Sequence, residues 1–165
     1  MRFNLIDKVE QLSDTRIIAV KFVSLAEEYL GDHFPTFPVL PGVLMLEAAT
    51  QAAGWILHKR TNFSRSIAVL KEARNVKYGH FVAPGNWLRL DVEFTKETPT
   101  GATFKATGTV DTEAGTQQAF NAKIEISYFN LADKNESLTT LDSKLTEHNR
   151  QRWQVLTAVD APASI

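Results

Sequence analysis

Apolar and polar residues alternate strictly along three stretches in the second half of the chain, at 88–95, 104–110 and 120–128. A period of two is typical of strands with one buried face. The connections at 99–101 and 113–115 contain proline or glycine and are short, so the pattern predicts a three-stranded antiparallel meander. The apolar positions are Leu88, Leu90, Val92, Phe94, Phe104, Ala106, Gly108, Val110, Phe120, Ala122, Ile124, Ile126 and Tyr128.

Other parts of the chain are also predicted to be regular. Ser66 to Tyr78 predicts a further strand, whose length favours β-bulges, and Arg16 to Val23 predicts an extended segment. Arg2 to Leu12 is interpreted as a short amphipathic helix. Its apolar side would hold Phe3, Leu5, Ile6 and Val9.

A long helix is predicted to begin at Gly42 and to end near Lys59 and Arg60. Pro41 and Gly42 suit a helix start, and basic residues are favourable at the negative end of the helix dipole. The apolar run from 43 to 57 is interrupted by polar residues and is shorter than the roughly 20 residues that a membrane span needs. The helix is therefore predicted to be buried, with no membrane span, and the proline-rich residues 30–42 before it are predicted to form a rigid loop.

A helix that is apolar on nearly every side can be buried by a curved sheet with one apolar face. The sequence therefore predicts an α+β fold of the hot-dog kind, in which a curved antiparallel sheet wraps around a long central helix. We expect residues 1–130 to form this domain and residues 131–165 to form a C-terminal accessory helix and tail of the same unit.

The accessory helix is predicted from about Ser137 to Trp153. Its apolar face would carry three leucines at helical spacing, and its charged residues would face water. Such a helix is expected to dock on the domain, because an isolated helix of this length is marginal in water. The leucines are Leu138, Leu141 and Leu145, and the charged residues are Asp142, Lys144 and Glu147.

Composition excludes several classes of function. The 165 residues suit one domain, and 18 basic against 19 acidic side chains give no electrostatic footprint for nucleic acid. Cysteine is absent, which excludes thiolate chemistry and disulfides. The sequence has neither a nucleotide-binding glycine motif nor a metal-ligand cluster, so no cofactor and no metal are expected. The first residues do not read as a secretory signal, which predicts a cytoplasmic protein.

Candidate chemistry lies between His33 and Glu47. A histidine in the stiff loop could act as a base, and a carboxyl group among apolar residues should be hydrogen-bonded, protonated or both. The N–H groups near Gly42 have no partners within the helix and could donate to a carbonyl oxygen that gains charge. Each feature alone also has an ordinary structural explanation, as a hydrogen-bonding histidine, a solvated glutamate or a helix start.

The segment GDHFPTFPVLPGVLMLEAATQA resembles the signature of the β-hydroxyacyl-acyl-carrier-protein dehydratases of the FabZ type, a hot-dog family. The shared positions are His-Phe-Pro, Pro-Val-x-Pro-Gly and Glu-Ala-x-x-Gln. A second block, ARNVKYGHFVAPGNWLRLDVEF, is also similar to the family. Thr36 and Asn86 depart from the family pattern, which usually has glycine and aspartate there, but neither departure removes a catalytic group.

The resemblance implies that the chain dehydrates 3-hydroxyacyl thioesters to trans-2-enoyl thioesters in fatty acid biosynthesis. His33 would remove the α-proton and Glu47 would help the hydroxyl leave as water. Gly42 and Val43 would bind the thioester carbonyl. Phe34, Pro41 and Gln51 would support the site, with Gln51 orienting the Glu47 carboxyl. Glu47 together with Val43 favours a simple dehydratase over the related dehydratase-isomerases.

The resemblance also implies partners. Its members pair His from one subunit with Glu from the other, so we expect a homodimer or a trimer of dimers. The acyl group would be carried on acyl carrier protein or coenzyme A, and Lys71, Arg74 and Lys77 could receive an acidic carrier protein. His58 and His80 are expected to have surface or helix-dipole roles.

Two alternatives remain open from the sequence. A hot-dog thioesterase would polarise the thioester with the same helix end but would direct water at the carbonyl carbon. A non-catalytic acyl-binding module would keep the motif for packing. Loss of water from the substrate, release of a free thiol, or neither would distinguish the three.

Overall fold

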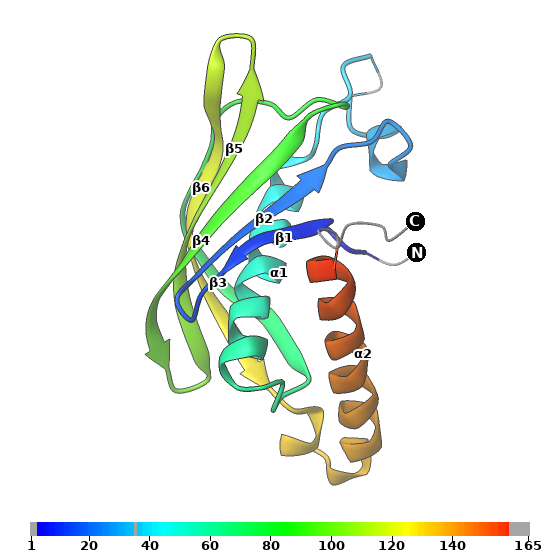
Figure 1. Ribbon diagram of the computed structural model, residues 1–165, viewed down its shortest axis with the longest axis vertical. Helices are drawn as coiled ribbons and strands as arrows, with labels where there is room; N and C mark the ends of the chain where they lie inside the picture. The colour runs from blue at the N-terminus through cyan, green and yellow to red at the C-terminus, as the bar shows by residue number, and fades with distance from the viewer. Residues whose placement is uncertain (1–2, 35, 159–165) are drawn as a thin grey trace.

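The computed structural model describes residues 3–34 and 36–158. Across these residues six strands form one antiparallel sheet in the order β1-β2-β4-β5-β6-β3. The sheet curves around α1, and α2 lies on the side of α1 away from the sheet (Figure 1). The elements are β1 (Lys8–Leu12), β2 (Arg16–Phe22), α1 (Gly42–Arg60), β3 (Ile67–Tyr78), β4 (Trp87–Thr98), β5 (Gly101–Thr112), β6 (Gly115–Phe129) and α2 (Thr139–Thr157), with short 3-10 helices at Glu28–Leu30, Leu131–Asp133 and Glu136–Leu138.

The predicted meander is confirmed. β4, β5 and β6 are neighbours joined by tight turns, with Leu90 opposite Gly108 and Ala106 opposite Ala122. The alternation places one face of each strand against α1, and nearly all of the predicted apolar positions are buried. Phe94 is only partly buried, and the guanidinium of Arg60, the last residue of α1, lies 4.3 Å from the centroid of its ring.

The long strand β3 has the predicted irregularities. Its pairing with β6 shifts register between Leu70 and Glu72 and again between Arg74 and Lys77. Asn75 lies in the second shift with φ of 52°, which is the left-handed conformation that one type of bulge uses. The bulges bend an edge strand that ends beside the start of α1.

Small side chains let α1 approach the sheet closely. Ala48, Ala49, Ala52 and Ala53 are at most 1% exposed, and a Cβ atom on Gly54 would lie 3.2 Å from the Cβ of Ala68 on β3. This is the predicted hot-dog arrangement, with a helix buried on most sides. Among the described residues no helix has the length and apolar character needed to cross a membrane.

The predicted N-terminal helix is wrong. Residues 8–12 form the edge strand β1, which pairs with β2 through Val9 opposite Ala19 and Leu12 opposite Ile17. The side chain of Ser13 accepts hydrogen bonds from the N–H groups of Thr15 and Arg16 and closes the turn. A short helix gains little stability of its own, whereas the strand extends the sheet through its pairing with β2 and still buries Val9.

The predicted C-terminal helix exists as α2, but one part of its predicted apolar face is wrong. Leu141 is 42% exposed and the carboxylate of Asp142 is buried. Asp142 accepts hydrogen bonds from the N–H groups of Leu131 and Ala132 at 2.9 and 2.8 Å, and from the hydroxyl of Ser66. These donors compensate the burial of a charge, so the helix docks partly through a carboxylate.

Candidate functional site

The His-to-Gly motif surrounds a cavity of about 330 Å³ at the start of α1. The loop before α1 contributes His33, Phe34 and Pro41, and the helix contributes Gly42 and Val43. The end of β3 and the residues after it close the other side. The remaining lining residues are Val39, Leu40, Met45, Tyr78, Gly79, His80, Phe81 and Ala119. His80 is exposed, as expected, although it also lies at this cavity.

The ring of His33 is half-buried and held by its own loop. Its Nδ1 atom lies 3.0 Å from the carbonyl oxygen of Val39. A carbonyl oxygen can only accept, so Nδ1 carries the proton and donates it. This leaves the lone pair of the neutral imidazole on Nε2, the tautomer that a base acting through Nε2 requires.

The first residues of α1, Gly42 and Val43, line the same cavity and carry backbone donors. The N–H groups of Leu44 and Met45 bond to the carbonyl oxygen of Pro41. Within the described residues the N–H groups of Gly42 and Val43 have no acceptor. They lie at the positive end of the dipole of a 19-residue helix, where a carbonyl oxygen that gains negative charge is stabilised.

Glu47 lies elsewhere in the same chain. It is half-buried on the second turn of α1, and it is not among the residues that line the His33 cavity. Its Oε1 atom accepts a hydrogen bond from Nε2 of Gln51 at 3.0 Å. The predicted hydrogen bond from Gln51 is therefore present, whereas His33 and Glu47 of one chain do not share a cavity.

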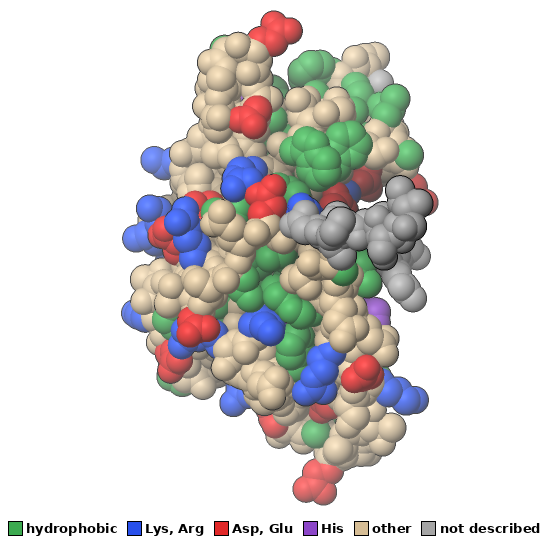
Figure 2. All heavy atoms as spheres, in the orientation of Figure 1, with side chains coloured by type: hydrophobic (Ala, Val, Ile, Leu, Met, Phe, Trp, Pro, Cys, Tyr) green, Lys and Arg blue, Asp and Glu red, His purple; other side chains and the backbone are tan. Residues whose placement is uncertain are grey.

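The cavity is bordered by exposed aromatic and aliphatic groups. Phe34 has φ of 60°, a conformation that costs energy in a non-glycine residue and recurs at functional sites. Phe37 and Phe81 meet edge to face at 5.7 Å between ring centroids. Figure 2 shows hydrophobic side chains near the end of the molecule where Figure 1 places the loop before α1. Phe34, Phe37, Val43, Tyr78 and Phe81 are each at least half exposed.

The expected surface role of His58 is wrong. The ring is buried between α1, β6 and α2, where Nδ1 lies 3.1 Å from the hydroxyl of Tyr128 and Nε2 lies 3.5 Å from Nδ2 of Asn149. Burial lowers the pKa of His58 to about 4. Sequence periodicity could not show this, because the covering residues come from distant strands and from α2. In the part of the chain that the structure describes, no three His, Asp or Glu side chains are grouped to hold a metal ion.

Known proteins of one family match most of the chain. A family model described as the FabA-like domain matches residues 1–122. A relative from Clostridium perfringens (strain SM101), named 3-hydroxyacyl-[acyl-carrier-protein] dehydratase FabZ, is 38% identical over 109 residues. The matched region is 66% of this chain and 78% of the relative.

Solved structures share the fold. The dehydratase heterocomplex ApeI:P from Xenorhabdus doucetiae matches with a TM-score of 0.55 and 20% identity, over 75% of this chain and 97% of that chain. A hypothetical thioesterase from Streptococcus pneumoniae, solved with coenzyme A, matches with a TM-score of 0.53 and 12% identity, over 74% and 85% of the two chains. At these identities the likeness establishes the fold alone.

Proposed function

The chain belongs to the FabA-like family, and from that premise we propose that it dehydrates 3-hydroxyacyl thioesters of acyl carrier protein to trans-2-enoyl thioesters in fatty acid biosynthesis. The observation that carries the proposal is the His33 ring, which is held through Nδ1 to Val39. The ring lies beside the N–H groups of Gly42 and Val43, which have no acceptor among the described residues. A base and an oxyanion site therefore border one cavity.

The proposed reaction begins with the proton on the carbon next to the thioester carbonyl. Nε2 of His33 takes this proton, and the N–H groups of Gly42 and Val43 stabilise the charge that develops on the carbonyl oxygen. The electron pair forms the carbon–carbon double bond as the bond to the 3-hydroxyl breaks. Glu47 supplies the proton with which that hydroxyl leaves as water, and proton transfer through solvent then restores both side chains.

We propose that two copies of the chain build each site. Glu47 does not line the His33 cavity of its own chain, so a second copy would supply the acid. The exposed apolar group around the cavity supports this, because patches of this kind mark protein contacts. The edge strand β3 is a further surface that pairing would cover. A homodimer, alone or within a trimer of dimers, would bring Glu47 of one copy to His33 of the other and would cover these exposed surfaces.

Acyl carrier protein is proposed as the substrate's carrier. Lys71 and Arg74 lie on β3 and form exposed ion pairs with Glu125 and Glu72, respectively. Such pairs contribute little free energy of folding. Carboxylates of an acidic partner can therefore replace Glu125 and Glu72 as the partners of these cations. Lys123 also lies between Lys105 and Arg74 in the strand register. Neighbouring like charges are unfavourable, and a carrier bearing negative charge would relieve the repulsion.

We further propose a cytoplasmic location, which cell fractionation would test.

The decisive experiment offers purified protein a panel of 3-hydroxyacyl thioesters on acyl carrier protein and on coenzyme A. Mass spectrometry would follow loss of water, and a thiol reagent would follow hydrolysis. We expect water loss without thiol release, abolished in His33→Ala. Thiol release instead would identify a thioesterase, which shares this fold, and neither signal would identify a non-catalytic module.

A further inference from the structure

The side-chain amide of Gln51 is fixed by three hydrogen bonds. Its Oε1 accepts from the N–H of Leu5 at 2.9 Å, while Nε2 donates to the carbonyl oxygen of Phe3 at 3.2 Å and to Oε1 of Glu47 at 3.0 Å. Both N–H bonds of the amide are therefore used. The N–H of Leu5 can only donate, so the amide cannot turn over without placing two donors against each other.

The fixed orientation of the Gln51 amide makes the two carboxylate oxygens of Glu47 different from each other. Oε1 accepts the hydrogen bond from Gln51, so a proton on the carboxyl group is favoured on Oε2. The oxygen that can give a proton to a leaving hydroxyl is therefore selected by residues 3–5 acting through Gln51.

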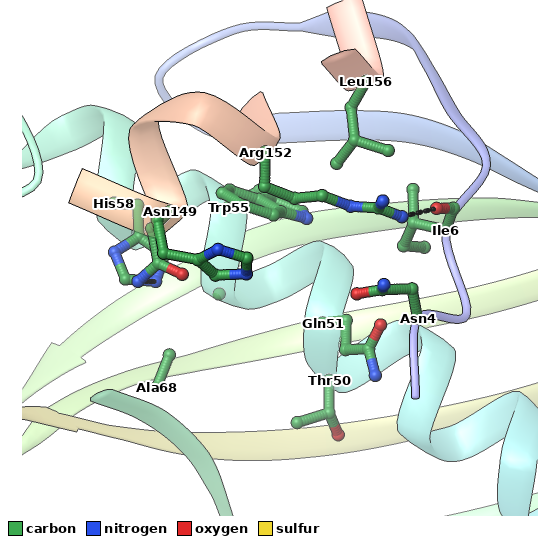
Figure 3. A pocket seen from close by; sticks show the side chains of 12 residues that line it. Asn4, Ile6, Thr50, Gln51, Trp55, His58, Ala68, Asn149, Arg152 and Leu156 are labelled. Carbon is green, nitrogen blue, oxygen red and sulfur yellow. Dashed lines mark hydrogen bonds between the residues drawn. The ribbon is translucent and has the colours of Figure 1, made fainter. Parts of the chain in front are cut away.

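Residues 3–6 are in turn held by α2. Nη2 of Arg152 donates to the carbonyl oxygen of Ile6 at 3.3 Å, and Figure 3 shows this bond among the residues that line the cleft between α1 and α2. Ile6 and Leu156 are at most 2% exposed and line the same cleft. Within the described part of the chain, backbone groups of residues 3–6 form hydrogen bonds with the side chains of Gln51 and Arg152.

The helix α2 is anchored independently of these residues. Its Asp142 is bonded to Ser66 and to two backbone N–H groups, and Asn149 donates to the carbonyl oxygen of Ser66 at 3.2 Å. Trp153 lies 5.7 Å from Trp55 of α1 between ring centroids. The helix is thus a fixed support on which Arg152 can hold the N-terminal segment.

We infer that α2, which lies beyond the residues matched by the family model, positions the acid of the reaction, and that Arg152 is a positioning residue. Arg152 holds residues 3–6, those residues orient Gln51, and Gln51 orients Glu47. The inference rests on the proposed function, because it assigns Glu47 the role of acid. A merely structural helix would affect stability but would leave the geometry at Glu47 unchanged.

The test compares Arg152→Met with a matched control on the same helix, Arg150→Met. Arg150 also donates to a carbonyl oxygen at 3.3 Å, that of Asn62, far in sequence from residues 3–6. Kinetics would use 3-hydroxyacyl-acyl-carrier-protein substrates, and hydrogen exchange would follow the Leu5 amide against amides of β5. Arg152→Lys tests rescue by a shorter donor.

We expect Arg152→Met to lower kcat roughly tenfold, because small misplacements of a catalytic group are costly, and to leave KM within about twofold. Exchange of the Leu5 amide should rise at least about tenfold, with β5 unchanged. Arg152→Lys should recover part of both effects, and Arg150→Met should show neither.

Faster exchange at Leu5 with an unchanged kcat would overturn the link to Glu47. Unchanged exchange would overturn the role of Arg152 itself. If the wild-type protein dehydrates no substrate, the proposed function fails and the inference about Glu47 fails with it. A kinetic match between Arg152→Met and Arg150→Met in an active enzyme would overturn this inference alone.

Discussion

Nδ1 of His33 lies 3.0 Å from the carbonyl oxygen of Val39, within the same proline-rich loop. The bond fixes both the plane of the ring and the position of its proton. Because Val39 is fully buried, the loop carries the ring on a rigid support. The backbone thus holds the His33 ring, before any substrate arrives, in the orientation that its proposed role as a base requires.

Replacement of His33 by Ala or Glu47 by Gln should each lower the dehydration rate at least about 100-fold, the usual effect of losing a positioned acid or base. Both side chains are only half-buried, so the variants should fold. Enzyme assays combined with thermal melts would check this. A variant that retained nearly the wild-type rate would remove that residue from the mechanism.

A mixing experiment tests whether two copies share each site. His33→Ala and Glu47→Gln subunits, unfolded and refolded together in equal amounts, should recover up to about 25% of wild-type activity. The reason is that half of the dimers are then mixed and each mixed dimer holds one intact site of two. Refolding each variant alone is the control. No recovery despite subunit exchange would show that His33 and Glu47 act within one chain.

Gly42→Ala should narrow the cavity without removing the backbone donor. A Cβ atom there would lie 2.8 Å from the ring of Tyr78, so the half-exposed ring, which lines the same cavity, must move. We expect kcat/KM to fall roughly tenfold and the double variant Gly42→Ala, Tyr78→Ala to recover part of it. Equal losses in the single and double variants would rule out the ring as the cause.

Stability should depend on pH through His58. Its folded-state pKa, about 4 because of burial, lies below the usual value near 6.5, so the unfolded chain binds the proton more tightly. The stabilisation is present above pH 6.5 and is lost as the pH falls toward 4, by about 3 kcal/mol at most. Urea unfolding of the wild type and His58→Gln between pH 4 and 7 should show a difference that changes with pH. A constant difference would contradict the burial of a neutral ring.

Asp142→Ala should loosen α2, because it leaves the Ser66 hydroxyl and two backbone N–H groups without their acceptor. Leu141→Ala is the matched control at the neighbouring, exposed position. We expect the first variant to lower Tm by roughly 5 °C and the second to change it little. A larger fall in Tm for Leu141→Ala than for Asp142→Ala would instead support docking through the leucine face that the sequence pattern predicts.

Low pH should weaken the hydrogen bonds that Asp142 accepts. Burial opposes ionisation of Asp142, but hydrogen bonds from Ser66, Ala132 and Leu131 outweigh it and hold the pKa of the carboxyl group below its ordinary value. This stabilisation is therefore present above the ordinary pKa and is lost as the pH falls through the lower, folded-state value.

Much of the fold follows from local patterns. The alternation at 88–95, 104–110 and 120–128 predicts the meander, because burial of one face of a strand leaves a period of two. The apolar run after Gly42 predicts α1, because a helix buried on most sides leaves a long apolar run. The motif from His33 to Gln51 likewise predicts the family. Residues 8–12 are misread, since their strand depends on pairing with β2.

Local sequence patterns are enough to predict the central helix, the meander and the chemical groups of the site. The burial of His58 and Asp142 depends on the folded arrangement of the whole chain. The same is true of the series of contacts through Arg152, Ile6, Leu5 and Gln51 that reaches Glu47. The physical reason is that a period reports which face of an element is apolar, whereas a buried polar group is stable only beside partners that come from distant parts of the chain.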